Sequence, residues 1–330
     1  MRRREFTTLI GGAALSWPLA ALAQRAERMR RVGVLMGYAE GDREGQAFVG
    51  AFRKELRNLG WIEPGNLAID IRWGGGNEET MERLAAELVA LKPDLILSHS
   101  TATTAAILEQ TRTIPVVFAN VTDPIGSSFV ASLPHPGGNA TGFVNMEDSM
   151  SGKWLQLLKE AAPRTRKVGF LFNPNTAPYF EYYLNYLQTA AAALAIEAVA
   201  ASVNDPSELE PVMAAHARAD GGGMIVMTDI FNTSHRVQII MLAARYRLPT
   251  IYPYRFFAEL GGLLSYGSDV FDNFRRAAGY ANRILRGVNP SELPVQAPVK
   301  FELVINLKTA RELPLDISAQ LQQRADAVIE

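Results

Sequence analysis

Short apolar runs alternate with amphipathic stretches along most of this chain of 330 residues. The run VGVLM at 32–36 is β-prone, and apolar side chains recur at helical spacing over 47–59. The same alternation continues with predicted strands at 67–71, 94–97 and 114–118 and predicted helices at 78–91 and 101–110. Strands that alternate with helices need crossover connections, so the pattern predicts a mostly parallel sheet.

The pattern then starts again in the second half of the chain. The run KVGFLF at 167–172 resembles RVGVLM at 31–36, and a long helix follows at 179–195. Further on, LPTIY at 248–252 matches IPVVF at 114–118. A repeat this long is not a solenoid unit, so the sequence predicts two similar α/β lobes, each a doubly wound parallel sheet.

The remaining segments predict how the lobes are joined. A helix beginning near Met150 separates the halves, and a helix at 271–285 and a strand at 301–306 follow the second repeat. Pro290, Pro294 and Pro298 are typical of a linker. Because the two repeats already account for two lobes, the segments that follow must be added to one or both of these lobes. This predicts that the chain crosses between the lobes more than once and that the crossings form a hinge.

We therefore expect one lobe to combine 31–146 with 266–294, and the other to combine 147–265 with 295–330. The first 23 residues are expected to be a signal peptide. Arg2, Arg3 and Arg4 precede an uncharged run at 7–22, and Ala21-Leu22-Ala23 suits a signal peptidase that cleaves after about Ala23. The order of arginines before Phe6 also resembles a twin-arginine export signal. This predicts a periplasmic protein.

Composition narrows the classes of partner. The chain is 48% hydrophobic and 20% charged, with a formal charge of −1, which does not favour disorder, a nucleic-acid partner or a membrane-surface patch. It has no cysteine, which excludes disulfides, thiolate metal sites, a thiol nucleophile and a lipid-modified cysteine. We expect a monomer with no cofactor and no membrane insertion.

In open parallel sheets, ligands bind beyond the carboxyl ends of the strands. Ser100, Thr101 and neighbouring hydroxyls begin a predicted helix there, where free amides can hold a carboxylate or where one of them simply caps the helix. Asp229 follows the corresponding strand of the second lobe, and it could pair with an ammonium group or cap a helix that begins near Ser234. Asp123, before Pro124, is a weaker acidic candidate.

Aromatic side chains gather in the same predicted loops and could hold an apolar or aromatic group. They are Tyr38, Tyr179, Phe231, Tyr252 and Tyr254. Catalytic interpretations find less support, because the four histidines lack metal-ligand spacing and no Gly-x-Ser-x-Gly motif is present. His99 and Ser100 are adjacent, but neighbouring residues point in different directions and no nucleophile motif supports them.

Several short sequence motifs along the chain occur in the same order as in one protein family. They are the signal segment, IPVVF with VTDP at 121–124, PGGNATG at 136–142, KWL at 153–155, FNP at 172–174, GGLLSYG at 261–267 and the segment 300–307. Together they resemble the ABC transporter substrate-binding proteins related to tryptophan-binding proteins. The resemblance implies a type I periplasmic binding protein fold, with two lobes joined by three crossings.

The resemblance also implies roles for individual residues. Ser100 and Thr101, with Asn120 and Thr122 as further candidates, would hold the carboxylate of an amino acid. Asp229 would hold its ammonium group. The side-chain pocket would be formed by Tyr179, Phe231 and Tyr254.

We therefore expect a periplasmic solute-binding component of an ABC importer, which captures an amino acid or related amphiphile and delivers it to a permease in the inner membrane. Two alternatives remain open at this point. One is a sensor domain, which would signal to a membrane receptor whether ligand is bound. The other is a doubly wound enzyme, which would convert a small metabolite. A neighbouring permease gene would favour transport, and turnover of a bound compound would favour an enzyme.

Overall fold

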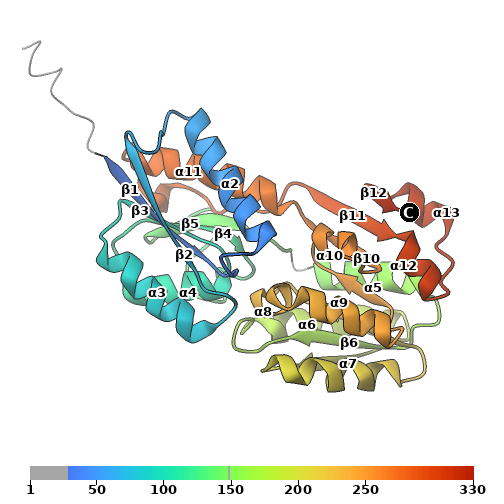
Figure 1. Ribbon diagram of the computed structural model, residues 1–330. Helices are drawn as coiled ribbons and strands as arrows, with labels where there is room; N and C mark the ends of the chain where they lie inside the picture. The colour runs from blue at the N-terminus through green and yellow to red at the C-terminus, as the bar shows by residue number, and fades with distance from the viewer. Residues whose placement is uncertain (1–28, 148) are drawn as a thin grey trace, which may run out of the picture.

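Two α/β lobes, each built on its own sheet, make up the computed structural model, which describes residues 29–147 and 149–330 (Figure 1). The predicted signal peptide lies outside the described residues. The strands of the first lobe are β1 (Arg30–Met36), β2 (Leu67–Trp73), β3 (Leu95–Ser98), β4 (Val116–Val121) and β5 (Ala140–Val144). Those of the second are β6 (Lys167–Phe172), β7 (Glu197–Ser202), β8 (Gly222–Val226), β9 (Thr250–Tyr252), β10 (Leu264–Ser268), β11 (Phe301–Asn306) and β12 (Ala327–Ile329).

Helices cover the sheets. In the first half of the chain they are α2 (Arg43–Asn58), α3 (Glu78–Ala90) and α4 (Thr101–Gln110). In the second half they are α5 (Met150–Ala161), α6 (Phe180–Ala193), α7 (Leu209–Ala217), α8 (Ile230–Ser234), α9 (Arg236–Arg245), α10 (Arg255–Glu259), α11 (Val270–Leu285), α12 (Leu307–Glu312) and α13 (Ala319–Gln323), with 3-10 turns at Pro206–Glu208 and Pro290–Glu292. None of the helices in the described part of the chain has the length and apolar character to cross a membrane.

The two sheets share one strand order. The first runs β2-β1-β3-β4-β5, and the second contains β7-β6-β8-β9-β10 before continuing to β11 and β12. Every pairing within these two sets of five is parallel, and only β10 and β11 pair in the antiparallel sense. This order is the doubly wound arrangement in which the chain reverses direction between the first and third strands. The predicted pair of similar lobes is confirmed.

Within the described residues, the order of elements takes the chain from one lobe to the other three times. The first crossing joins β5 to α5, which packs on α6 and β9 of the second lobe. After β10 the chain returns, because α11 packs against α2, β3 and β4 of the first lobe. It crosses for the third time before β11, which pairs with β10. Figure 1 shows α11 beside α2, far from the rest of the C-terminal half.

The proline-containing segment after α11 corrects the sequence prediction of a linker. Leu293 and Val295 are buried, and the Thr141 hydroxyl donates to the Leu293 carbonyl. Gln296 donates its backbone N–H to Gly142 and forms a parallel bridge with Phe143. The segment therefore packs along the open edge of β5, a position at which proline is tolerated because the edge needs few backbone donors.

Candidate functional site

The carboxyl ends of equivalent strands face each other across the two lobes. Fourteen residues, seven from each lobe, line a cavity of about 310 Å³ of empty space, its openings to solvent included. The first lobe contributes Tyr38, His99, Ser100, Thr101, Asn120, Thr122 and Asn145, and the second contributes Thr176, Tyr179, Thr228, Asp229, Ile230, Thr233 and Tyr254. Most of these positions follow β1 and β3 or β6 and β8, the strands between which each sheet reverses its winding and where doubly wound proteins bind ligands.

Ser100 begins α4 at the cavity wall. Its side chain accepts from the backbone N–H of Thr103, so the expected helix cap is present. Its backbone has φ 151° and ψ 167°, a conformation that residues other than glycine rarely adopt. The hydroxyl of Thr104 holds this loop by donating to the Ser100 carbonyl. The N–H groups at the start of α4 that precede Thr103 have no partner within the helix, so they can receive an anion.

Thr101 and Tyr179 form the contact between the lobes on one side of the cavity. The Thr101 hydroxyl accepts from the backbone N–H of Thr122, which links the loops after β3 and β4. Tyr179 donates its hydroxyl to the Thr228 carbonyl at 3.0 Å. Burial raises the pKa of Tyr179 well above its usual value, although interactions with the Thr122 and Thr101 side chains oppose this rise. The phenol therefore stays protonated.

Asn120, Asn145 and Tyr254 form a polar cluster at the crossing between the lobes. Both carboxamide Nδ2 groups donate to the Tyr254 hydroxyl, each at 3.0 Å. Asn145 Nδ2 also lies 3.2 Å from the backbone carbonyl of Asn120. The two Oδ1 atoms are buried and have no protein partner. Asn120 also has φ 68°, in the left-handed region, where asparagine is more common than most residues.

The Asp229 carboxylate lies in the cavity wall and caps α8. It accepts from the backbone N–H groups of Asn173 and Phe231 and from the Thr176 hydroxyl. Burial raises its pKa to about 6, against these three hydrogen bonds, which lower it. The predicted cap is therefore present, but the capped helix begins at Ile230 rather than near Ser234. A carboxylate has about four acceptor positions, so one remains for a ligand donor.

Two predicted site residues lie elsewhere. Asp123 accepts from the backbone N–H of Gly126 and lines a neighbouring, wider cleft. Phe231 packs against His235, with ring centroids 4.4 Å apart and the rings tilted by 38°, and lines a separate groove. Phe231 lies two residues after the cap, and it is not among the residues that line the cavity beside Asp229. Tyr252, named among the aromatic candidates, is buried in the second lobe beside Phe257.

Sequence reasoning missed six residues of the cavity, among them Asn145 and Thr176. Asn145 follows β5, a strand that the sequence pattern did not identify, so no strand end pointed to it. His99 is packed between the rings of Tyr38 and Phe274, and both of its ring nitrogens lack a partner. Burial lowers the pKa of His99 to about 3, so the imidazole stays neutral.

The lobes are in contact around the cavity, as expected of a closed form. Arg236 of the second lobe pairs with Asp42 of the first at 2.7 Å, with the two side chains 11% and 13% exposed. Gly37 faces Ile230 so closely that an added Cβ would lie 2.6 Å from Ile230 Cγ1. Gly76 approaches Ser234 in the same way.

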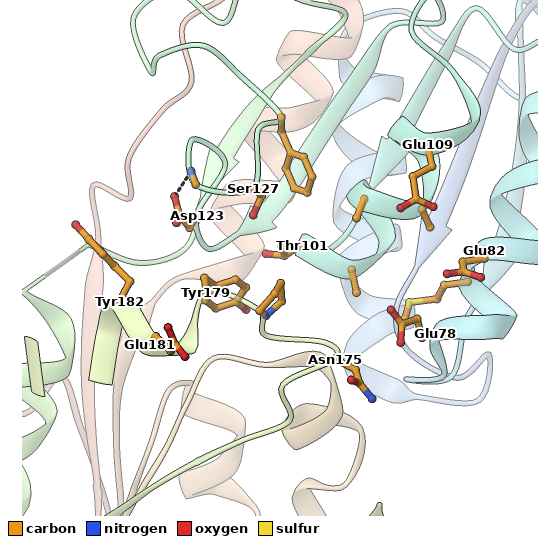
Figure 2. Close-up of a pocket in the computed structure, with 17 residues that line it drawn as sticks. Glu78, Glu82, Thr101, Glu109, Asp123, Ser127, Asn175, Tyr179, Glu181 and Tyr182 are labelled. Atoms are coloured by element: carbon orange, nitrogen blue, oxygen red, sulfur yellow. Dashed lines mark hydrogen bonds between the residues drawn. The ribbon is translucent and has the colours of Figure 1, made fainter. Parts of the chain in front are cut away.

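A wider cleft of about 1310 Å³, which includes open solvent, shares Thr101 and Tyr179 with the cavity (Figure 2). Glu78, Glu82 and Glu109 line it on the side of the first lobe, and Glu181 and Tyr182 line it from α6. Burial and the two neighbouring glutamates raise the pKa of Glu78. Within the described residues, no three histidine, aspartate or glutamate side chains are grouped so as to hold a metal ion.

Comparison with known proteins gives one consistent result. Residues 38–329 match the profile of a family described as ABC transporter substrate binding protein. A tyrosine-binding protein of Clostridioides difficile is 27% identical over 266 residues, which are 80% of this chain and 75% of the relative. A conserved domain protein from Vibrio cholerae superposes with a TM-score of 0.82 at 27% identity, covering 91% of this chain and 100% of that one.

Two further structures share the fold at lower identity. The ABC domain from Streptococcus pneumonia in complex with L-Trp has a TM-score of 0.82 and 23% identity, and it covers 91% of this chain and 99% of that one. The ligand-free, open structure of a substrate-binding protein from Clostridium difficile has a TM-score of 0.66 and 21% identity over the same shares. The type I fold expected from the sequence is thereby confirmed.

Proposed function

The chain belongs to the family of ABC transporter substrate-binding proteins, and from this premise we propose that it captures an amino acid or a related amphiphile between its lobes and delivers it to an ABC permease. The observation that carries the proposal is the shared cavity, to which each lobe contributes seven residues. Among these described residues the only ionised group at neutral pH is Asp229, which suits a ligand of small net charge.

The lining suggests how an amino acid would be oriented. Ser100, Thr101 and Thr122, with the first amides of α4, would receive the carboxylate. Asp229 would attract the ammonium group through its remaining acceptor position. Tyr38, Tyr179 and Tyr254 provide aromatic surface for the side chain. A tyrosine-binding relative and a solved neighbour in complex with L-Trp support an aromatic amino acid as the first candidate.

The proposal includes the setting in which the protein works. The basic, apolar and small-residue segments at 1–23 support export and removal of a signal peptide, which would place a monomer in the periplasm beside the inner-membrane permease. Lobe boundaries close to 31–146 with 266–294 and 147–265 with 295–330 are part of the same proposal, with the second crossing after β10 and the third after Gln296. No chemical change of the ligand is required, since the cavity's residues bind rather than activate.

Calorimetry on residues 24–330 tests the proposal with aromatic amino acids first and branched ones next. We expect at least one to bind with a Kd in the micromolar range or below, about −8 kcal/mol or stronger. Thr122→Arg, which fills the cavity, should abolish binding, whereas Thr189→Arg on the exposed face of α6 should leave it unchanged. Binding weaker than about millimolar for every amino acid would contradict the proposal.

A further inference from the structure

The carboxamide of Asn145 is fixed in one orientation by its neighbours. Its Nδ2 donates both to the Tyr254 hydroxyl and to the backbone carbonyl of Asn120. A flipped carboxamide would place Oδ1 against that carbonyl oxygen, which is another acceptor and would repel it. Asn120 has no such second contact, so its amide could turn and accept from the Tyr254 hydroxyl. The Oδ1 of Asn145 is therefore the acceptor that the protein cannot satisfy by rearranging an amide.

Asn145 is one of the residues that line the proposed ligand cavity. Asn145 is 4% exposed, and its Oδ1 is buried with no protein donor in hydrogen-bond range. Leaving a buried carbonyl oxygen unpaired costs free energy, so such atoms in folded proteins usually have a partner. The partner that the site calls for is a hydrogen-bond donor. The α-ammonium group is the hydrogen-bond donor that amino acids share, whatever their side chain.

We propose that Asn145 is a specificity-determining residue whose Oδ1 accepts a hydrogen bond from the ammonium group of the ligand. This inference rests on the proposed function and assigns it a residue at the hinge that neither the strand pattern nor the family resemblance indicated. Asp229 contributes charge, but three protein donors already engage its carboxylate. Asn145 contributes an uncharged acceptor that only the ligand pairs with.

The same cluster explains how recognition would affect closure. Asn145 follows β5, immediately before the chain first crosses to the second lobe. Its Nδ2 bridges Asn120 of the first lobe and Tyr254 of the second, so the second of these hydrogen bonds forms only when the lobes meet. A ligand donor on Oδ1 completes the hydrogen bonding of a group that already joins both lobes. An amine ligand is thus favoured in the closed form over an analogue without the amine.

Matched ligand pairs test this inference. We would measure the affinities of L-tryptophan against indole-3-propionate and of L-tyrosine against 3-(4-hydroxyphenyl)propionate, because each pair differs only in the ammonium group. The wild type should prefer the amino acid by about 10- to 100-fold, the scale of a charged hydrogen bond. Asn145→Leu, similar in shape but without an acceptor, should reduce this preference at least fivefold. Asn145→Asp keeps an acceptor for the ligand donor, so it should retain the preference, although its second oxygen faces the Asn120 carbonyl and should weaken the binding of both members of a pair.

A structural role for Asn145 would give a different result. Loss of hinge geometry would weaken the amino acid and its analogue equally and leave their ratio unchanged, which would overturn the inference. Asn139→Leu is the matched control, since Asn139 Nδ2 donates to the Ile114 carbonyl away from the cavity. Asn145→Ala, which also lacks a side-chain acceptor, replaces Asn145→Leu if that variant does not unfold cooperatively. If the wild type binds neither member of either pair nor any other amino acid, the proposed function fails instead.

Discussion

At the scale of single residues, the proposed role of Asp229 would link its protonation to ligand binding. Burial raises the pKa of Asp229 to about 6 from an ordinary 3.8. Because the folded protein then holds this proton more tightly than the unfolded chain, the protonated form adds stability below about pH 4. That stability is lost as the pH rises through about 6. The ionised form is nevertheless the one that attracts an ammonium group.

Affinity for an amino acid should therefore rise with pH. Between pH 5 and pH 7 we expect an increase of about tenfold, because at pH 5 most of the free protein carries a proton on Asp229. His99 stays neutral over this range, since its pKa is lowered to about 3, and Tyr254 stays protonated, since burial raises its pKa to about 12. Calorimetry at several pH values measures how the affinity for the amino acid changes with pH.

Asp229→Asn is the control for this assignment. It should bind an amino acid more weakly at pH 7, by about 1.5 to 3 kcal/mol, and it should lose most of the pH dependence. The variant keeps a side-chain oxygen that can cap α8, so its fold should be retained. An affinity that changes with pH equally in the wild type and in this variant would remove Asp229 from the site.

At the scale of elements, the repeated strand–helix units could be predicted from sequence. The continuous apolar runs of β1, β3, β4 and β6 identify buried parallel strands, and their order placed Ser100 and Asp229 at facing strand ends. β5 and β7 were not predicted, because β5 is short and contains glycine, and β7 (EAVAAS) is rich in alanine, which has little β-propensity. Missing β5 also meant missing Asn145.

The sequence prediction that Phe231 and Asp123 share a cavity with Asp229 differs from the structure for another reason. Sequence places both residues in loops at strand ends, but the direction of a side chain there depends on local turns. Asp229 engages the Phe231 backbone in its cap, and Asp123 closes its own turn on Gly126. Such short-range hydrogen bonds decide which neighbouring residue faces a cavity, and neither pattern nor composition encodes them.

The loop after β1 yields a prediction about closure. Gly37 allows the first lobe to approach α8, because a Cβ there would lie 2.6 Å from Ile230 Cγ1. Gly37→Ala should therefore hold the lobes apart and weaken ligand binding about tenfold, at small cost to the fold of either lobe. Adding Ile230→Ala should restore much of the affinity by making room. Calorimetry on the single and double variants checks this coupling.

Gly50 provides the matched control, since nothing lies within 4 Å of a Cβ added there on the exposed side of α2. Gly50→Ala should bind ligand as the wild type does. If Gly37→Ala also binds normally, or if Ile230→Ala gives no rescue, the close approach at this loop does not control closure.

At the scale of the whole molecule, the ion pair between Asp42 and Arg236 bridges the two lobes. Both side chains are mostly buried, so removing one charge leaves the other poorly paired. Asp42→Asn keeps a residue able to cap α2 while removing the charge, and should shift the lobes toward an open form by about 1 to 3 kcal/mol. Small-angle scattering should report a larger radius of gyration at equal ligand concentration.

Arg245→Gln is the comparison variant, because Arg245 pairs with Glu210 within the second lobe on an exposed surface. It should leave both the scattering profile and the affinity unchanged. An Asp42→Asn variant that closes as readily as the wild type would show that the interlobe ion pair contributes nothing to closure.

Native mass spectrometry tests the central claim most directly, namely that the lobes close around one small molecule and leave it unaltered. The chain, recovered gently from its own cells and then incubated with amino acids, should carry one non-covalent ligand per chain, released unchanged on unfolding. A chain that remains ligand-free under both conditions, or that releases a chemically converted product, would contradict the account.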